Sequence, residues 1–317
     1  MSENILDLRP KSLDDYIGQE KVKQQIKLFI QASKQKKRPL DHILFTGAPG
    51  LGKTTLASLI AKELDANIIT TTGAILNKKG DLAGILTSLE EGDVLFIDEI
   101  HRINKSVEEL LYSAMEDFKI DILIGKDRSA KTIRLDIPRF TLIGATTRAG
   151  LLSSPLLSRF GIILQFDFYD ENSLSQIIKK SAEKLGIKIT DEASLEIAKR
   201  SRGTPRIANR LIKRIEDFAV VKNKEEIDLK LVLEAFEFLG IDEYGLDFKD
   251  REYLKVLAFN FEGKPTGIKT LCIALSEEQD TIEQVIEPYL IKIGFIIKTP
   301  KGRVITERGL NHIKNYT

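Results

Sequence analysis

The sequence predicts an α/β protein with three parts: a parallel-sheet domain, a small all-helical domain and a C-terminal winged helix. Residues 1–168 alternate short apolar runs with helical patterns. Residues 169–241 show helical periodicity with little strand signal, and residues 242–317 end in two short strand-like runs after a series of helices. Because each pattern continues over a length typical of a domain or subdomain, we expect the domain boundaries at these positions.

Three apolar runs in the first part are typical of buried strands, at residues 42–46, 94–97 and 140–144. A glycine-rich turn and a predicted helix at residues 53–64 follow the first of them. Strands that alternate with helices in this way pair in parallel and are covered by helices on both faces. The pattern therefore predicts an α/β sheet domain.

The two later parts differ in their periodicity. The helical part carries apolar residues at helical spacing, as at Leu211 and Ile215. In the last part, strand-like runs at residues 294–298 and 303–306 flank a turn, and residues 292–314 hold six basic side chains and one acid. Helices followed by a basic hairpin are typical of a winged helix, a fold that commonly binds DNA.

Composition limits the class of protein. The chain has 317 residues, of which 42% are hydrophobic and 30% charged, as in ordinary soluble proteins. No apolar run approaches the roughly 18 residues of a membrane span, and the first residues lack the pattern of a signal peptide. The single cysteine, Cys272, lies in an apolar run and is expected to pack in a core. These features predict a cytoplasmic protein without a membrane segment.

The net charge of +1 restricts how the chain binds nucleic acid. A protein that holds phosphate backbones tightly over a large surface is usually more basic. We therefore expect any DNA contact to be transient and to come from local basic patches. The basic residues 34–38 are expected to form a solvated helix end and loop rather than such a patch.

A phosphate-binding loop is the strongest motif. Residues 47–54 match the P-loop pattern in full, between a predicted strand and a predicted helix. Its glycines let backbone N–H groups curl around phosphate oxygens, and the start of the helix adds positive potential. Lys53 is expected to reach the β- and γ-phosphates of ATP, and Thr54 to hold Mg²⁺.

A second motif follows about 45 residues later, where four apolar residues end in Asp98 and Glu99. A buried strand would place both carboxylates at the carboxyl edge of the sheet, where ligands bind in open α/β sheets. Asp98 is then expected to assist the metal ion, and Glu99 to orient or deprotonate the attacking water. His101 has no cysteine or histidine partner at metal-ligand spacing, so we interpret it as structural.

Two arginines stand at positions that suit a site. Arg159 comes shortly before an apolar run, and Arg206 lies in the first turn of a helix for which Thr204 and Pro205 form a typical start. From spacing alone, either arginine is equally compatible with ordinary surface charge.

The chain resembles the RuvB family of AAA+ ATPases along nearly its whole length. The resemblance lies in residues 8–10, 16–19, 47–54, 98–102, 115–118, 143–150, 159–161, 203–210 and 287–290. The P-loop is shared by many NTPases and specifies little. The run at residues 143–150, together with the other segments, is far more specific.

The resemblance implies an ATP- and Mg²⁺-dependent motor that forms a homo-hexameric ring around duplex DNA. Such a ring drives branch migration at Holliday junctions held by RuvA, in recombination and repair, and acts indirectly with the RuvC resolvase. The nucleotide contacts that the resemblance implies are Leu8, Arg9, Ile17, Gly50, Gly52, Lys53, Thr54, Thr55, Glu116, Asp117, Phe118, Arg159, Tyr169 and Arg206.

Matching motif positions also imply individual roles. Thr146 resembles the sensor of the γ-phosphate, Arg159 the finger donated to a neighbouring subunit, and Arg206 the second sensor in the helical lid. Lys298 and Arg303, in the wing, stand where the family contacts DNA.

The segment at residues 119–137 resembles the hairpin that docks on RuvA, with an apolar face from Ile122, Leu123 and Ile124. From its residues alone, the segment is two strands around a polar turn. Without the resemblance, an alternating apolar face of that kind favours core packing over docking.

Two positions depart from the family pattern, and two other functions stay open. Ala48 replaces a usual proline in the P-loop, and Leu157–Ser158 replaces a basic-acidic pair before Arg159.

A clamp-loader subunit would share the P-loop and the finger, but is expected to end in a helical collar. A nucleotide-gated DNA-binding switch with little turnover would need neither Glu99 nor Arg159.

Overall fold

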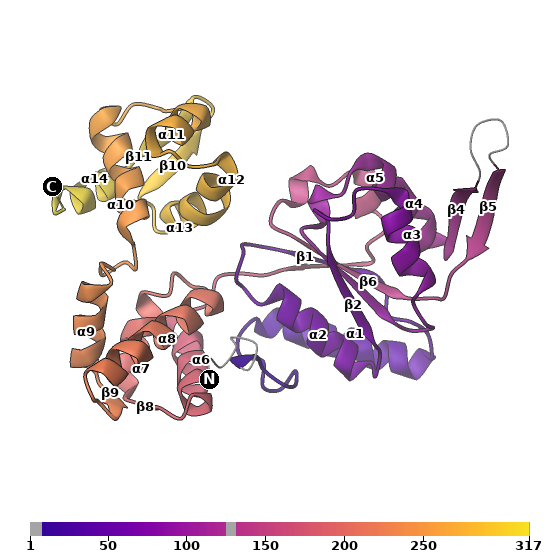
Figure 1. The fold of residues 1–317 in the computed structure, drawn as a ribbon, viewed down its shortest axis with the longest axis horizontal. Coiled ribbons are helices and arrows are strands. Elements are labelled where there is room, and N and C mark those ends of the chain that lie inside the picture. The colour runs from indigo at the N-terminus through magenta and orange to yellow at the C-terminus, as the bar shows by residue number, and fades with distance from the viewer. Residues whose placement is uncertain (1–7, 125–130, 317) are drawn as a thin grey trace. The chain divides into compact units, whose positions relative to one another are not determined.

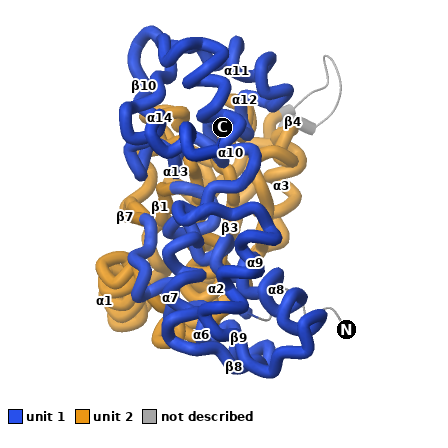
Figure 2. Tube along the Cα trace, turned by 90° about the vertical axis from the view of Figure 1, so that its left-hand side faces the viewer, with its two compact units in different colours: residues 1–8, 48–50, 168–317 blue, residues 9–47, 51–167 orange. Residues whose placement is uncertain are grey.

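The structure is a computed structural model that describes residues 8–124 and 131–316. It forms two compact units (Figure 2). One unit, the sheet unit, comprises residues 9–47 and 51–167; the other, the lid–wing unit, comprises residues 1–8, 48–50 and 168–317. Each unit is described below by itself.

The sheet unit is built on five parallel strands in the order β2-β3-β6-β1-β7. Helices α1 and α2 cover one face of the sheet, and α3 and α4 cover the other (Figure 1). The predicted parallel-sheet fold is therefore confirmed. The bounds are β1 Ile43–Thr46, β2 Ile68–Thr72, β3 Val94–Asp98, β6 Thr141–Thr146 and β7 Ile162–Gln165, with α1 Glu20–Lys36, α2 Lys53–Glu63, α3 Lys79–Thr87 and α4 Lys105–Glu116.

The largest core of this unit lies between the sheet and helices α3 and α4. Helix α4 contributes Val107, Leu110, Leu111 and Ala114, all buried and spaced as one face of a helix. Asn104 caps the helix, since its side-chain oxygen accepts the N–H of Val107. This packing fixes the strand ends that carry Asp98 and Thr146.

A hairpin of strands β4 (Lys119–Ile124) and β5 (Lys131–Asp136) extends away from the sheet domain (Figure 1). Its base is packed, because Ile120 is fully buried and Ile122 packs partly against the core. Ile133, paired with Ile122 across the strands, is 42% exposed. The side chains of Leu123 and Ile124, and the turn at residues 125–130, lie outside the described residues.

The lid is helical, as the periodicity predicts, and its helices are α6 (Glu171–Lys184), α7 (Asp191–Lys199), α8 (Pro205–Val221) and α9 (Leu229–Phe238). It also holds a parallel pair of two-residue strands, β8 (Lys188–Ile189) and β9 (Glu226–Ile227). This pair is not predictable from the sequence, because two residues are too few to show an alternating pattern.

The C-terminal part is a winged helix, as predicted. Strands β10 and β11 form its antiparallel hairpin, and the helix expected near Tyr253–Phe259 is α10 continued by a π-helical segment, Val256–Asn260. Tyr253, Leu271 and Phe295 lie in its core, with Cys272 packed partly against it. The bounds are α10 Phe248–Lys255, α11 Ile268–Leu275, α12 Gln279–Thr281, α13 Glu287–Lys292, β10 Ile296–Thr299, β11 Gly302–Ile305 and α14 Glu307–Lys314.

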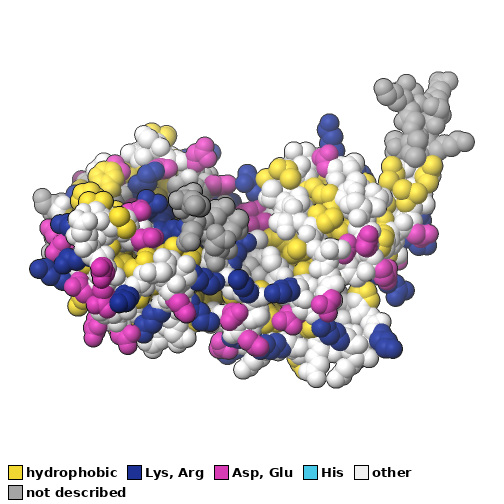
Figure 3. All heavy atoms as spheres, turned by 60° about the horizontal axis from the view of Figure 1, so that its bottom comes forward, with side chains coloured by type: hydrophobic (Ala, Val, Ile, Leu, Met, Phe, Trp, Pro, Cys, Tyr) yellow, Lys and Arg dark blue, Asp and Glu magenta, His cyan; other side chains and the backbone are white. Residues whose placement is uncertain are grey.

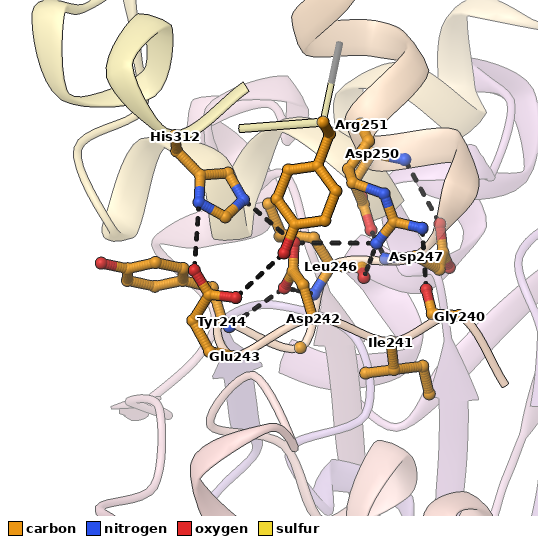
Figure 4. Close-up of polar contacts among 12 residues, drawn as sticks. Gly240, Ile241, Asp242, Glu243, Tyr244, Leu246, Asp247, Asp250, Arg251 and His312 are labelled. Carbon is orange, nitrogen blue, oxygen red and sulfur yellow. Dashed lines mark hydrogen bonds and ion pairs between the residues drawn. The ribbon is translucent and has the colours of Figure 1, made fainter. Parts of the chain in front are cut away.

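The segment between lid and winged helix is fixed by polar contacts (Figure 4). The imidazole Nε2 of His312 lies 3.0 Å from a carboxylate oxygen of Asp242, and the guanidinium of Arg251 donates to the carbonyl of Gly240 at 2.8 Å. Arg202, a buried lid residue, donates to the carbonyl of Gly245 at 2.7 Å. These contacts join the last lid residues to the winged helix, which lie together in one compact unit.

The surface agrees with the small net charge. Acidic and basic side chains are interspersed on the face that Figure 3 shows. The basic residues 34–38 stand at the end of α1, where Lys37 adopts a left-handed conformation, so the predicted helix end is confirmed. Within residues 8–124 and 131–316, no helix is long and apolar enough to cross a membrane.

Candidate functional site

The loop after β1 has a backbone that only glycine accommodates. Gly47, Gly50 and Gly52 have φ angles of 138°, 81° and 95°. A Cβ atom at Gly47 would lie 2.6 Å from the carbonyl oxygen of Phe166, and one at Gly52 would lie 2.5 Å from the hydroxyl of Tyr16. The backbone oxygen at Gly47 leaves no room for a side chain, and the positive φ angles at Gly50 and Gly52 disfavour one, so the glycines set the shape of the loop.

This loop leads into the N-terminus of α2. Gly52 precedes the helix and supplies no side-chain cap, which leaves the first N–H groups for a ligand. The buried ammonium of Lys53 donates to the carbonyl of Gly47 at 2.8 Å across the loop. Thr54 and Thr55, both partly buried, follow in the first turn. N–H groups at a helix N-terminus beside an ammonium form a site for phosphate.

The two predicted acids lie at the same edge of the sheet. Strand β6 separates β1 from β3, and Asp98 is the last residue of β3. A carboxylate oxygen of Asp98 accepts the N–H of Glu99 at 3.0 Å. Glu99 adopts a left-handed conformation with φ of 50°, which is rare for a residue with a side chain and is concentrated at functional sites.

Gly73 supports this conformation of Glu99. A Cβ atom at Gly73 would lie 2.4 Å from the carbonyl oxygen of Glu99, and the N–H of Gly73 donates to the carbonyl of Asp98 at 2.8 Å. The backbone around the two acids is thus held from the neighbouring strand β2.

His101 links two of the predicted catalytic residues. Its Nδ1 lies 2.9 Å from the hydroxyl of Thr146, and its Nε2 lies 3.3 Å from a carboxylate oxygen of Glu99. The sequence analysis missed this arrangement, since 45 residues separate His101 from Thr146. The one available signal was the distance of two residues between Glu99 and His101, in a segment that folds as a short 3₁₀ helix, Ile100–Arg102.

The hydroxyl of Thr146 is engaged within the protein. Thr146 is fully buried at the end of β6, and its oxygen accepts the N–H of Arg148 at 2.9 Å in addition to its contact with His101. The hydroxyl of the next residue, Thr147, is also buried and has no hydrogen-bond partner among the described residues. An orphaned buried hydroxyl calls for a partner. Thr147, which the sequence analysis did not single out, is therefore the better placed of the two to meet a ligand.

Besides Gly50, the lid–wing unit holds three predicted nucleotide contacts. The N–H of Arg206, at the start of α8, donates to the carbonyl of Gly50 at 3.3 Å. The N–H of Tyr169 donates to the carbonyl of Gly203 at 2.9 Å, and the carbonyl of Leu8 accepts from Lys184 at 3.3 Å. The predicted contacts Arg9 and Ile17 belong to the sheet unit, where Arg9 is exposed and Ile17 is partly buried.

Arg159 is held by residues of its own chain. Its guanidinium donates to the carboxylate of Glu116 at 2.7 Å and lies over the ring of Tyr112, 4.7 Å from the centroid. Glu116 is thereby brought together with Arg159, and the exposed Asp117 follows it. Phe118 has a positive φ and packs edge-on against Phe140 in the core, a position that fits structural support of this segment.

The two predicted DNA contacts share a buried acid. The carboxylate of Glu287, which has no exposed surface, lies 2.6 Å from the ammonium of Lys298 and accepts from Arg303 at 2.7 Å. Arg303 also donates to Glu283 at 2.7 Å, and the hydroxyl of Tyr253 donates to Glu287 at 3.0 Å. The pKa of Tyr253 is raised by burial. This network engages both basic side chains with acids of the winged helix, although the side chain of Lys298 stays 44% exposed.

Three family profiles match the chain in sequence. Residues 8–166 match the Holliday junction DNA helicase RuvB P-loop domain, residues 169–242 the RuvB AAA lid domain, and residues 243–314 the RuvB C-terminal winged helix domain. The chain belongs to the RuvB family. The predicted AAA+ sheet domain, helical lid and winged helix are thereby shown.

Relatives cover nearly the full length of the chain. It is 56% identical to the Holliday junction branch migration complex subunit RuvB of Clostridium kluyveri, over 98% of this chain and 89% of the relative. It is 57% identical to the subunit of the same name from Thermotoga maritima, over 97% of this chain and 92% of the relative. The solved structure of the Thermotoga maritima RuvB Holliday junction branch migration motor superposes with a TM-score of 0.90, at 53% identity over 97% of this chain and 98% of that chain.

Proposed function

We propose that this chain is an ATP-driven DNA translocase of the cytoplasm that drives branch migration of Holliday junctions in recombination and repair. The observation that supports it best is the meeting, at one sheet edge, of the phosphate loop, the uncapped start of α2 and the Asp98–Glu99 pair. Relatives of known name are subunits of a branch-migration complex. Residues 1–168 then bind ATP, residues 169–241 form the lid and residues 242–317 bind DNA.

The residues at the sheet edge divide the work of ATP hydrolysis. The N–H groups of the loop and of α2 hold the phosphates, and Lys53 neutralises charge between the β- and γ-phosphates. Thr54 and Asp98 would hold Mg²⁺, which supplies positive charge to the phosphate oxygens when bound. Glu99 orients the attacking water and accepts its proton. The hydroxyl of Thr147, or of Thr146 as predicted from the sequence, senses the γ-phosphate.

The lid and the winged helix convert hydrolysis into movement. Arg206 reports the nucleotide to the lid, and the lid carries the wing through the polar contacts that join them. In a ring of six subunits, Arg159 completes the site of the neighbouring subunit. The β4–β5 hairpin docks on RuvA, which holds the junction, and the RuvC resolvase acts on the same complex without a required contact to this chain.

A branch-migration assay tests the proposal. The chain, RuvA, ATP and Mg²⁺ are incubated with a synthetic four-way junction, and the products are separated from the junction. We expect products with the wild type and none with Glu99→Gln, which keeps the size of the side chain but removes the carboxylate. Glu99→Gln should still bind ATP. Wild-type protein that hydrolyses ATP in response to a sliding clamp, and leaves junctions intact with RuvA, would replace the proposal with a clamp-loading function.

A further inference from the structure

A continuous chain of polar contacts joins the ends of two strands at the candidate site. The hydroxyl of Thr146, at the end of β6, contacts Nδ1 of His101 at 2.9 Å. Nε2 of the same imidazole lies 3.3 Å from a carboxylate oxygen of Glu99, which follows β3. The imidazole is almost fully covered, with 5% of its side chain exposed, whereas the side chain of Glu99 is 26% exposed. A buried ring thus contacts an accessible carboxylate.

The contacts of Thr146 indicate where the protons lie. Its oxygen accepts the N–H of Arg148 at 2.9 Å, so its own hydroxyl hydrogen is available to donate to Nδ1 of His101. A neutral imidazole that accepts at Nδ1 carries its hydrogen on Nε2. That N–H then faces the carboxylate of Glu99. In the tautomer that accepts from Thr146 at Nδ1, the hydrogen on Nε2 is therefore directed at Glu99.

The backbone conformation of Glu99 is fixed, but it does not determine the direction of the carboxylate. The left-handed φ of Glu99 and the close packing of Gly73 on its carbonyl determine where the side chain starts. A glutamate side chain still has three rotatable bonds, so a partner is needed to hold its end in one direction. Nε2 of His101, 3.3 Å from a carboxylate oxygen, supplies such a partner.

We propose that His101 is a positioning residue that holds the carboxylate of Glu99 in the orientation in which it acts on the attacking water. Thr146 holds the imidazole in turn, as second partners do for histidines in other sites. Because Thr146 precedes Thr147, the chain of contacts also connects the phosphate-sensing end of β6 to the base. The inference rests on the proposed function, since it assigns His101 a part in the same hydrolysis.

Two substitutions of His101 separate positioning from packing. Gln carries an amide N–H at about the distance of Nε2 from the backbone, and Asn carries one at about that of Nδ1. His101→Gln therefore keeps the contact with Glu99, whereas His101→Asn keeps only the contact with Thr146. We expect His101→Asn to lower kcat by about 10- to 100-fold, with His101→Gln recovering most of the loss. Binding of a fluorescent ATP analogue should stay within about twofold in both.

The same substitution in a Glu99→Gln background shows whether His101 acts through Glu99. We expect His101→Asn to cause no further loss there, because the carboxylate that it positions is absent. An equal loss in both backgrounds, or a kcat for His101→Asn within about twofold of wild type, would overturn the proposal. If His101→Asn is not obtained as folded protein, His101→Leu replaces it in the same comparison.

Wild-type turnover separates this inference from the proposed function. If the wild type hydrolyses no ATP with RuvA and junction DNA, the proposed function fails whatever His101 does. If the wild type is active and His101→Asn is equally active, only the role of His101 fails.

Discussion

The carboxylate of Glu287 lies 2.6 Å from the ammonium of Lys298, although Glu287 has no exposed surface. The same carboxylate accepts a hydrogen bond from Arg303, whose side chain is 12% exposed. A buried carboxylate is costly unless it is paired and hydrogen-bonded. The two basic residues that the sequence marks as DNA contacts therefore also compensate a buried acid of the winged helix, the largely covered Arg303 from inside and the 44% exposed Lys298 from the surface.

Replacing Arg303 tests this internal role. Arg303→Ala leaves Glu287 buried with part of its compensation lost, so we expect the free energy of unfolding to fall by roughly 3–5 kcal/mol. Lys301→Ala, at an exposed position of the same hairpin, should change it by less than about 0.5 kcal/mol. Denaturant unfolding of the two variants gives the comparison.

In binding to duplex DNA, we expect Lys301→Ala to have the larger effect and Arg303→Ala the smaller. If Lys301 contacts a phosphate, its loss reduces the magnitude of the slope of log affinity against log salt concentration by about 0.9. Arg303→Ala, measured at low temperature where it is folded, should keep most of that slope. An Arg303 variant of wild-type stability with a reduced salt slope would instead support the direct DNA contact predicted from the sequence.

Local motifs were predictable, and contacts between distant residues were not. The P-loop is readable because glycines, lysine and threonine act within eight consecutive positions, from Gly47 to Thr54. The contact of His101 with Thr146 spans 45 residues and that of Arg303 with Glu287 spans 16. No periodicity relates such pairs, because their meeting depends on strand order and helix packing. The same reason explains why the buried, unpartnered hydroxyl of Thr147 was missed.

The hairpin shows an intermediate case. The alternation of its residues predicts two strands, and the register confirms them. The alternation does not indicate where along one face the side chains cease to be buried. In the structure, Ile120 is buried, Ile122 is partly buried and Ile133 is exposed. The end of this face at Ile120 therefore packs in the core, and the end at Ile133 is accessible for docking.

A charge at Ile133 tests docking on RuvA without disturbing the core. Ile133→Asp should abolish stimulation of ATP hydrolysis by RuvA and leave basal hydrolysis and unfolding unchanged, because its side chain is already exposed. Thr132→Asp, also exposed, places the same charge on the opposite face of β5 and should keep the stimulation. Ile120→Asp should fail to fold. Normal stimulation of Ile133→Asp by RuvA would remove this face from the docking surface.

Acid stability of the junction between lid and winged helix depends on Asp250. Burial raises the pKa of Asp250 to about 6, and the opposing attraction of Arg202 is the smaller effect. The protonated form is favoured in the folded state, so its stabilising contribution is fully present below the usual pKa of 3.8 and is lost as pH rises through 6. The difference corresponds to roughly 3 kcal/mol.

Asp250→Asn mimics the protonated side chain at every pH. Its stability relative to the wild type should therefore rise between pH 5 and pH 8, measured by denaturant unfolding across that range. Asp14→Asn is the control, because Lys27 lowers the pKa of the exposed Asp14 and its titration falls below this range. Parallel pH profiles for wild type and Asp250→Asn would show that Asp250 is ionised throughout.

The last prediction concerns Arg159, which the proposal assigns to the neighbouring subunit's ATP. Within its own chain, its guanidinium pairs with Glu116 and lies over the ring of Tyr112. A guanidinium against the γ-phosphate stabilises charge in the transition state, and its loss lowers turnover by about 10³–10⁵. Arg159→Ala should therefore bind ATP with near-normal affinity and hydrolyse it poorly. Wild-type hydrolysis per subunit should rise steeply with protein concentration, because each site is completed only when a neighbour docks.

Mixing two inactive variants decides between action on the neighbour and action within one chain. Arg159→Ala lacks the finger and Lys53→Ala lacks the phosphate-binding ammonium, yet a mixed ring contains interfaces where an intact P-loop faces an intact Arg159. ATP hydrolysis should return in part on mixing, with a maximum at intermediate ratios. Subunit exchange is verified by pulling down one tagged variant and detecting the other. Because a finger that acts on its own chain leaves both variants defective in any mixture, verified mixed rings without recovered hydrolysis would assign Arg159 to its contacts with Glu116 and Tyr112 instead.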